Sequence, residues 1–234
     1  MYSFESRIRY SETDCEQRLT LPALINYFQD CSTFQAEDVG VGFQYMKERK
    51  QVWVLTSWQI DIDRYPKMGE RVVVGTIPYE IRGFFGQRNF FMKGEDGSFL
   101  AKANTLWTLI EIETEKPRRA AKEMLDCFQI GEKLEMQYAD RKILIPEVRE
   151  ARGQIPVVQH HLDANRHVNN GQYVSIAMEF LPEGLQVKRL RAEYRKQAFL
   201  GDVMVPYIAK EENRYVISIQ NPEGQCYAVV EFTV

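Results

Sequence analysis

The chain has 234 residues, of which 44% are hydrophobic and 27% charged, a composition typical of globular proteins and not of disordered ones. With a net charge of −3, the chain lacks the overall positive charge by which many proteins attract nucleic acid. No apolar run reaches the roughly 18–20 residues that a membrane-spanning helix needs. Four cysteines without a CxxC pair, and a first segment without the apolar core of a signal peptide, predict a cytoplasmic protein with free thiols.

The first half of the sequence predicts one strand, one long helix and then several strands. Alternation predicts a strand over residues 3–10, and apolar residues at helical spacing predict a helix over Leu21–Asp38 with Thr20 as its N-cap and Pro22 in its first turn. Five of its side chains are expected to face a core: Leu24, Tyr27, Phe28, Cys31 and Phe34. Strands are expected to follow at 52–62, 71–77, 87–93 and 98–112.

The second half repeats this order with shorter loops. A strand is expected at 155–159, a helix at 169–181, and strands at 187–196, 202–209, 214–220 and 225–234. Matched positions support the repeat, because Asp14 aligns with Asp163, Gly69 with Gly201, and Gly97 with Gly224.

A helix followed by antiparallel strands in each half predicts an α+β fold in which a sheet wraps around a helix. We therefore expect an N-terminal domain over residues 1–125, a charged linker on the surface over 126–153, and a C-terminal domain over 154–234. A short helix is expected near 120–128.

The residues best suited to chemistry precede the second helix. Asp163, Asn165 and His167 alternate, and in an extended segment alternate side chains point to the same side. The next helix is expected to begin at once, with Asn169 or Asn170 as its cap and free backbone N–H groups in its first turn. An acid, an amide and an imidazole beside such N–H groups suit hydrolysis of an activated acyl group, with either His167 or Asp163 as the base.

Two other interpretations of these residues stay open at this point. Asp, Asn and His before a helix commonly serve only as caps and turns. A zinc site built from His160, His161 and His167 is the second, but no further cluster of ligands completes it, so no metal is expected.

Residues 162–170, LDANRHVNN, resemble the Asp-x-Asn-x-His-Val-Asn-Asn motif of the acyl-ACP thioesterases of plants and bacteria. Other segments resemble the same family in the same order, over nearly the whole chain: Trp58, 68–70, 83–88, 101–107, 118–119 and 193–196. The resemblance implies two tandem hotdog folds, with the acyl chain held mainly by the first and catalysis in the second. Asp163, Asn165 and His167 match the family's site residues.

The sequence departs from the family motif after Glu193-Tyr194-Arg195-Lys196. The family continues with Glu-Cys, whereas this chain has Gln197 and Ala198, so a cysteine nucleophile is excluded at that place. Direct attack by water, assisted by Asp163 and His167, is therefore expected, and Gln197 can position water but cannot act as a base. The residues expected to support the site are Asn169, Asn170 and Gln197.

In the first half, Glu16 and Arg18 stand where the motif has its amide and imidazole, which predicts an inactive pseudo-site around Asp14. A basic run lies in the second half and contains Lys188, Arg189, Arg191 and Arg195. It fits either a solvated strand face or a docking patch for an acidic carrier protein and the phosphate of its pantetheine arm.

The expected function is hydrolysis of fatty acyl-phosphopantetheine thioesters on acyl carrier protein, which ends fatty acid elongation and requires no organic cofactor. The alternatives are an acyl-CoA thioesterase, a hotdog dehydratase without motif support, and a non-catalytic acyl-binding module. The sequence leaves open the length, saturation and branching of the acyl chain. A homodimer also stays open, because two fused halves already provide the pairing that single hotdog units obtain from a partner.

Overall fold

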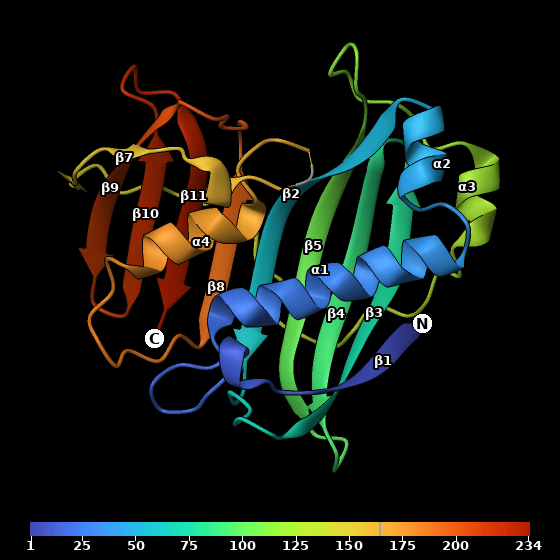
Figure 1. Cartoon of the computed structure of the whole chain (residues 1–234), viewed down its shortest axis with the longest axis horizontal. Coiled ribbons are helices and arrows are strands. Elements are labelled where there is room, and N and C mark those ends of the chain that lie inside the picture. Colours follow the sequence, from blue (N-terminus) through green and yellow to red (C-terminus); the bar gives the residue numbers. More distant parts are fainter. Residues whose placement is uncertain (164) are drawn as a thin grey trace. The chain divides into compact units, whose positions relative to one another are not determined.

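The computed structural model describes residues 1–163 and 165–234, and these divide into two units. Unit 1 comprises residues 1–56 and 60–138, and unit 2 comprises 57–59 and 139–234. In each unit a helix crosses one face of an antiparallel sheet (Figure 1). The predicted α+β arrangement is thus confirmed for both halves. Among the described residues, no helix has the length and apolar character needed to span a bilayer.

The sheet of unit 1 has the strand order β1-β3-β4-β5-β2. Its strands are β1 (Tyr2–Arg7), β2 (Gln51–Ile62), β3 (Arg71–Arg82), β4 (Phe85–Gly94) and β5 (Phe99–Glu111). Its helices are α1 (Leu21–Asp38), α2 (Phe43–Glu48), α3 (Lys122–Cys127) and the 3-10 helix η1 (Tyr10–Glu12). Figure 1 shows α1 running across β3, β4 and β5.

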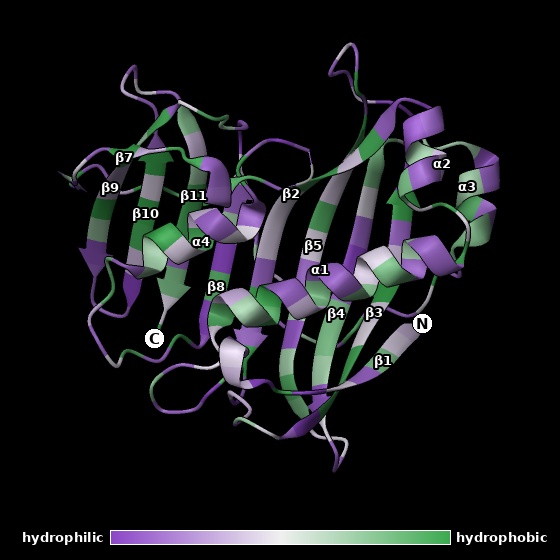
Figure 2. Ribbon diagram, in the orientation of Figure 1, coloured by the Kyte–Doolittle hydropathy of each residue, from purple (hydrophilic) through white to green (hydrophobic). Residues whose placement is uncertain are grey.

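The sheet of unit 2 has the strand order β8-β11-β10-β9-β6, and β7 also pairs with β9. Its strands are β6 (Glu150–Ala151), β7 (Ile155–Pro156), β8 (Arg189–Tyr194), β9 (Val203–Glu211), β10 (Arg214–Gln220) and β11 (Cys226–Thr233). Its helices are the 3-10 helix η2 (Gln159–His161) and α4 (Asn170–Met178). Hydrophobic residues recur along the strands beneath α1 and α4, whereas many loops at the sheet ends are hydrophilic (Figure 2).

Helix α1 has the bounds predicted from the sequence. The Thr20 hydroxyl accepts a hydrogen bond from the backbone N–H of Ala23 at 3.3 Å, and Pro22 lies in the first turn, where no intrahelical N–H is needed. Four of the five apolar side chains expected to face the core are buried: Leu24, Tyr27, Phe28 and Cys31.

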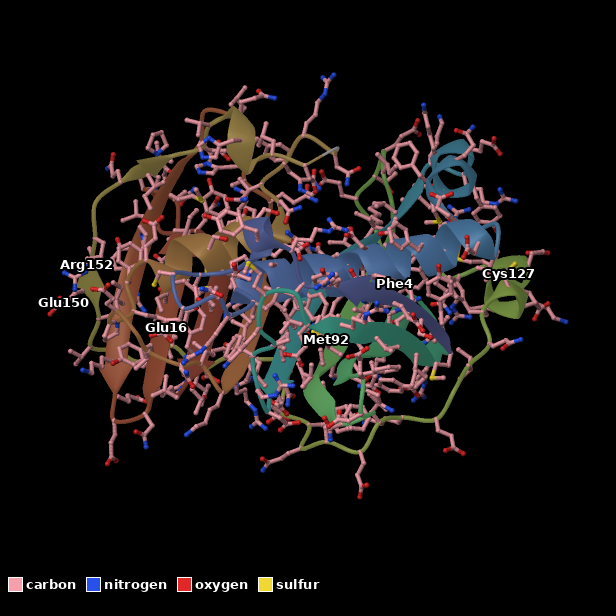
Figure 3. The ribbon with its side chains drawn as sticks, turned by 60° about the horizontal axis from the view of Figure 1, so that its bottom comes forward. Phe4, Glu16, Met92, Cys127, Glu150 and Arg152 are labelled. Atoms are coloured by element: carbon pink, nitrogen blue, oxygen red, sulfur yellow. The ribbon has the colours of Figure 1, made fainter. Side chains whose placement is uncertain are left out.

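The prediction for the fifth, Phe34, was wrong, because 46% of this residue is exposed. Its ring packs edge-on against Phe4 on the edge strand β1, with ring centres 5.6 Å apart; Figure 3 shows Phe4 beside α1. Gln35 continues the buried stripe instead, since its amide oxygen accepts a hydrogen bond from Arg88 on β4 at 2.6 Å.

The segment that connects the two repeats packs on the sheet faces opposite α1 and α4. In unit 1, the backbone N–H of Leu134 and the hydroxyl of Tyr138 both donate to the side-chain oxygen of Asn89 at 3.0 Å. In unit 2, Ile143 is 1% exposed and belongs to a core cluster with Ala209, Val216 and Val229. The expectation of a surface connection is therefore wrong for Ile143, while the domain bounds derived from the sequence remain a prediction.

Candidate active site

The segment from Asp163 to His167 forms a tight turn between η2 and α4. Leu162 and Val168 pair as a β-bridge at its base. The N–H of Asp163 donates to the carbonyl of His167 at 3.0 Å, and the N–H of Arg166 donates to the carbonyl of Asp163 at 3.0 Å. Arg166 adopts a left-handed φ of 65° to close the turn. The prediction of an extended run was therefore wrong; Ala164, inside the motif, lies outside the described residues.

The turn nevertheless brings Asp163 and His167 together. His167 Nδ1 lies 3.6 Å from Asp163 Oδ2, and the two side chains are only 19% and 22% exposed. His167 Nδ1 also lies 3.4 Å from the carbonyl oxygen of Val168. Because both acceptors lie on the Nδ1 side, they favour the tautomer protonated there and leave the Nε2 lone pair available for a proton from water.

Asn165 does not join this pair. Its backbone N–H donates to Asp163 Oδ1 at 2.8 Å, so one carboxylate oxygen closes the turn while the other faces His167. The Asn165 residue is exposed, and within residues 1–163 and 165–234 its side chain has no hydrogen bond to Asp163 or His167. Its place on the exposed rim of the turn suits contact with a substrate from outside.

Helix α4 begins directly beside the turn. Asn169 is its N-cap, as expected, and the Asn169 side-chain oxygen accepts a hydrogen bond from the N–H of Gly171 at 2.8 Å. This cap leaves the N–H of Asn170 without an acceptor among the described residues. A free N–H at a helix start is a donor suited to a developing negative charge.

Two tyrosines that sequence reasoning missed fix the surroundings of the turn. Tyr194 on β8 donates from its hydroxyl to the carbonyl of Asn170 at 3.0 Å. The hydroxyl of Tyr173 accepts a hydrogen bond from the N–H of Ala198 at 3.1 Å. Burial raises the pKa of both phenols, so they stay neutral. Nothing in the spacing distinguishes them from ordinary core aromatics, although Tyr194 lies within a segment that resembles the family.

The loop that Tyr173 holds runs alongside His167. Ala198 accepts the N–H of Val168 at 2.9 Å, and Phe199 pairs with His167 as a β-bridge. Gln197, at the start of this loop, is half-buried but has no hydrogen bond to Asp163 or His167 in the described part of the chain. Its supporting role therefore stays a prediction.

The first repeat contains the same turn. The N–H of Asp14 donates to the carbonyl of Arg18 at 2.9 Å, that of Gln17 to the carbonyl of Asp14 at 3.0 Å, and that of Glu16 to Asp14 Oδ1 at 2.9 Å. Gln17 has a φ of 60°, like Arg166. The alignment of Asp14 with Asp163 is confirmed. The first turn differs chemically, because Arg18 pairs with Glu16 at 2.8 Å.

The matched glycines also have the same roles in the two repeats. Gly69 and Gly201 have φ values of 80° and 89°, and their N–H groups donate to Ile8 and Val157 at 2.9 and 3.2 Å. These left-handed positions favour glycine in both halves. The repeated hydrogen bonds support a duplication that residue identities alone are too few to prove.

Comparison with known proteins agrees with this repeated architecture. Residues 1–128 match the acyl-ACP thioesterase N-terminal domain, and residues 147–232 match the acyl-ACP thioesterase C-terminal domain. The chain belongs to the acyl-ACP thioesterase family. The resemblance of motif 162–170 and of the other segments is thereby confirmed.

The curated relatives of this thioesterase family member include plant proteins. The chloroplastic acyl-[acyl-carrier-protein] hydrolase FATB3 of Cuphea viscosissima is 24% identical over 225 residues, which are 88% of this chain and 54% of the relative. The chloroplastic palmitoyl-acyl carrier protein thioesterase of Gossypium hirsutum is 24% identical over 223 residues, which are 87% and 54%. The chain thus spans about half the length of the curated relatives it matches.

Solved structures of acyl-ACP thioesterases have the same fold. That of a Bacteroides thetaiotaomicron acyl-ACP thioesterase has a TM-score of 0.90 at 21% identity and covers 99% of this chain and 96% of that chain. The 12:0-ACP thioesterase from Umbellularia californica has a TM-score of 0.87 at 19% identity, with coverage of 99% and 96%. These similarities confirm the predicted pair of hotdog folds.

The histidines outside the turn of this family member have local roles. The His161 Nδ1 accepts a hydrogen bond from the N–H of Val158 at 3.2 Å, and its ring packs edge-on against His160 at 4.4 Å. Burial and the neighbouring His160 lower the pKa of His161. Among residues 1–163 and 165–234, no group of three or more metal-binding side chains comes together.

Two arginines of the basic run are used inside unit 2. Arg191 pairs with Glu231 at 2.9 Å and donates to the carbonyls of Asp140 and Lys142, so it fastens the connecting segment to the sheet. Arg195 pairs with Glu193 at 3.0 Å. Lys188 is exposed and Arg189 half-buried. Since carboxylates pair with Arg191 and Arg195, a docking role for the full set stays a prediction, with less free charge than the sequence alone indicated.

Proposed function

We propose that this acyl-ACP thioesterase family member hydrolyses fatty acyl thioesters of acyl carrier protein and releases the free fatty acid. The observation that carries the proposal is the half-buried Asp163–His167 pair, 3.6 Å apart, beside the start of α4. The curated relatives named as acyl-[acyl-carrier-protein] hydrolases support the carrier protein as the substrate's carrier. Location in the cytoplasm stays a prediction from the sequence.

In the proposed mechanism, His167 is the general base. Its Nε2 takes a proton from water as the water oxygen attacks the thioester carbonyl, and Asp163 stabilises the imidazolium that forms. Asp163 suits this role better than that of the base, because its Oδ1 already accepts the N–H of Asn165. The N–H of Asn170 stabilises the oxyanion. As the intermediate collapses, the C–S bond breaks and His167 returns the proton to the departing thiolate.

Assay of acid release tests the proposal directly. The protein is incubated with dodecanoyl and palmitoyl thioesters of acyl carrier protein and of coenzyme A, and the released acids are quantified. We expect catalytic release from the carrier-protein substrates. Faster release from the coenzyme A substrates would favour the acyl-CoA thioesterase alternative, and release from neither carrier would exclude hydrolysis of these acyl groups.

A further inference from the structure

The half-buried Arg88 on β4 directs its guanidinium toward Gln35 on α1 in unit 1. Its Nη1 donates to the side-chain oxygen of Gln35 at 2.6 Å and to the hydroxyl of Thr76 at 3.2 Å. The guanidinium carbon lies 6.0 Å from the ring centre of Phe90 and 5.6 Å from that of Phe128. The cation thus lies between two polar side chains and two aromatic rings.

No carboxylate neutralises Arg88 in the part of the chain that the structure describes. The titratable group that acts on it is the thiol of Cys31, one turn before Gln35 on α1. Burial raises the pKa of Cys31 to about 12, so this thiol is uncharged at neutral pH and supplies no counter-charge. Burial also lowers the pKa of Arg88 to about 10, which still leaves the guanidinium charged. A half-buried cation without a counter-ion loses part of its hydration, and an anionic ligand that pairs with it would compensate for this loss.

One edge of the guanidinium is left open. Both protein hydrogen bonds use Nη1, and neither Nε nor Nη2 has an acceptor among residues 1–163 and 165–234. These two nitrogens present parallel N–H groups in the fork that binds both oxygens of a carboxylate. Apolar side chains lie near the guanidinium, because the buried ring of Phe90, 6.0 Å from the guanidinium carbon, packs against the buried ring of Phe28 at 5.4 Å.

We infer that the Nε–Nη2 edge of Arg88 binds the carboxylate of an aliphatic chain held in unit 1. An aliphatic carboxylate matches both the unpaired edge of the guanidinium and the aromatic rings beside it, because its carboxylate can pair with the guanidinium and its chain can pack against the rings. The carboxylate has two possible sources: the free fatty acid, or a second carboxylate at the far end of an acyl group. The inference rests on the proposed function only in assuming that unit 1 receives aliphatic chains.

Calorimetric titration with free ligands tests this site without requiring turnover. The probes are dodecanoate, methyl dodecanoate and the mono-N-ethylamide of dodecanedioic acid, each below its micelle concentration. For the wild type we expect at least one carboxylate probe to bind about tenfold or more tightly than the ester, as expected for charge-assisted hydrogen bonds. Tight binding of dodecanoate identifies the free fatty acid as the source, and tight binding of the amide alone identifies a far-end carboxylate.

The variant Arg88→Met removes the cation, and Arg82→Met is its matched control, since Arg82 is an exposed arginine at the end of β3. We expect Arg88→Met to bind the ester and the carboxylates equally, and Arg82→Met to behave as the wild type. Circular dichroism checks that both variants are folded, and the wild-type comparison of ester with carboxylate stands even if Arg88→Met is not.

Equal affinity of the wild type for ester and carboxylates, or undiminished carboxylate binding by folded Arg88→Met, overturns the inference. These outcomes are independent of catalysis. A protein that releases fatty acids but binds the ester as tightly as the acid contradicts only the Arg88 site. A protein that binds carboxylates through Arg88 but releases no acid contradicts only the proposed function.

Discussion

Asp14 and Asp163 occupy the same position in two copies of one turn, and each accepts a hydrogen bond from the backbone N–H two residues later, at 2.9 and 2.8 Å. The two turns differ in what faces the second carboxylate oxygen. In the second repeat it is the half-buried imidazole of His167, whereas Asp14 is exposed and Arg18 pairs with Glu16. The turn of the first repeat can therefore serve as an internal control for substitutions in the turn of the second repeat.

We therefore expect His167→Ala and Asp163→Asn to lower kcat by about 10²–10⁴-fold, the usual contribution of general acid–base catalysis. Asp14→Asn changes the matching carboxylate in the first turn and is expected to leave kcat within about twofold of the wild type, because no imidazole faces it. The measurement is kcat for acyl-carrier substrates, with circular dichroism as a check on folding. A large loss of kcat in Asp14→Asn together with a near-normal kcat in His167→Ala would place the catalytic site in the first repeat and contradict this assignment.

The left-handed backbone of Arg166 gives a second test. Its φ of 65° is unfavourable for a β-branched residue, so Arg166→Val is expected to strain the turn by about 1–2 kcal/mol and to reduce kcat as well as stability. Arg166→Gly is expected to keep both, since glycine adopts this conformation freely. The matched variant Gln17→Val strains the first turn equally, at a φ of 60°, and is expected to reduce stability while kcat is retained. Parallel unfolding and kinetic measurements separate these outcomes.

The sequence predicted α1 to the residue because its signals are local: the Thr20 cap, Pro22 in the first turn and apolar residues at helical spacing. It mistook the site turn for an extended run, because alternate spacing does not show that Arg166 adopts a left-handed conformation. The errors at Phe34 and Ile143 have another cause. Burial at these positions depends on residues far away in the sequence. On α1, Gln35 is buried because it accepts a hydrogen bond from Arg88 on β4. In the connecting segment, Ile143 is buried because it packs into the core of unit 2.

Tyr173 is expected to act as a positioning residue. Tyr173→Phe leaves the N–H of the buried Ala198 without its acceptor, which costs about 1–3 kcal/mol and frees the loop that pairs with His167. We expect kcat to fall while KM changes little, because the acyl chain is expected to be held mainly by the first hotdog fold. Tyr215→Phe removes a phenolic hydroxyl from β10 and is the control, with kcat expected to be unchanged. If both variants lose stability equally and neither loses kcat, Tyr173 is only a core residue.

Glu193 predicts how stability responds to acid. Burial alone opposes its ionisation, but hydrogen bonds from Arg195 at 3.0 Å and from the N–H of Ile143 at 3.0 Å outweigh burial and lower the pKa of Glu193. A carboxyl with a lower pKa in the folded than in the unfolded state stabilises the fold above the unfolded pKa, and this stabilisation is lost as the pH falls. The free energy of unfolding of the wild type should therefore decrease below about pH 5 more steeply than that of Glu193→Gln.

Urea unfolding between pH 7 and pH 3 measures this difference. The exposed Glu212→Gln is the control and is expected to follow the wild-type pH profile. A profile of Glu193→Gln that runs parallel to the wild type over the whole range contradicts the role assigned to this carboxylate.

The basic run of unit 2 contains arginines that hold the fold and an exposed lysine, Lys188, that can contact a partner. Arg191→Ala is expected to lower the free energy of unfolding by about 2 kcal/mol, because it breaks a mostly buried ion pair, although Glu231 keeps Arg214 at 2.6 Å. Lys188 is exposed, so Lys188→Glu is expected to leave stability unchanged and to raise KM several-fold for the acidic carrier substrate. Added salt should shrink that difference, since it screens exposed charges. KM measured at two salt concentrations decides the matter: a Lys188→Glu protein with wild-type KM at low salt has no docking role at this position.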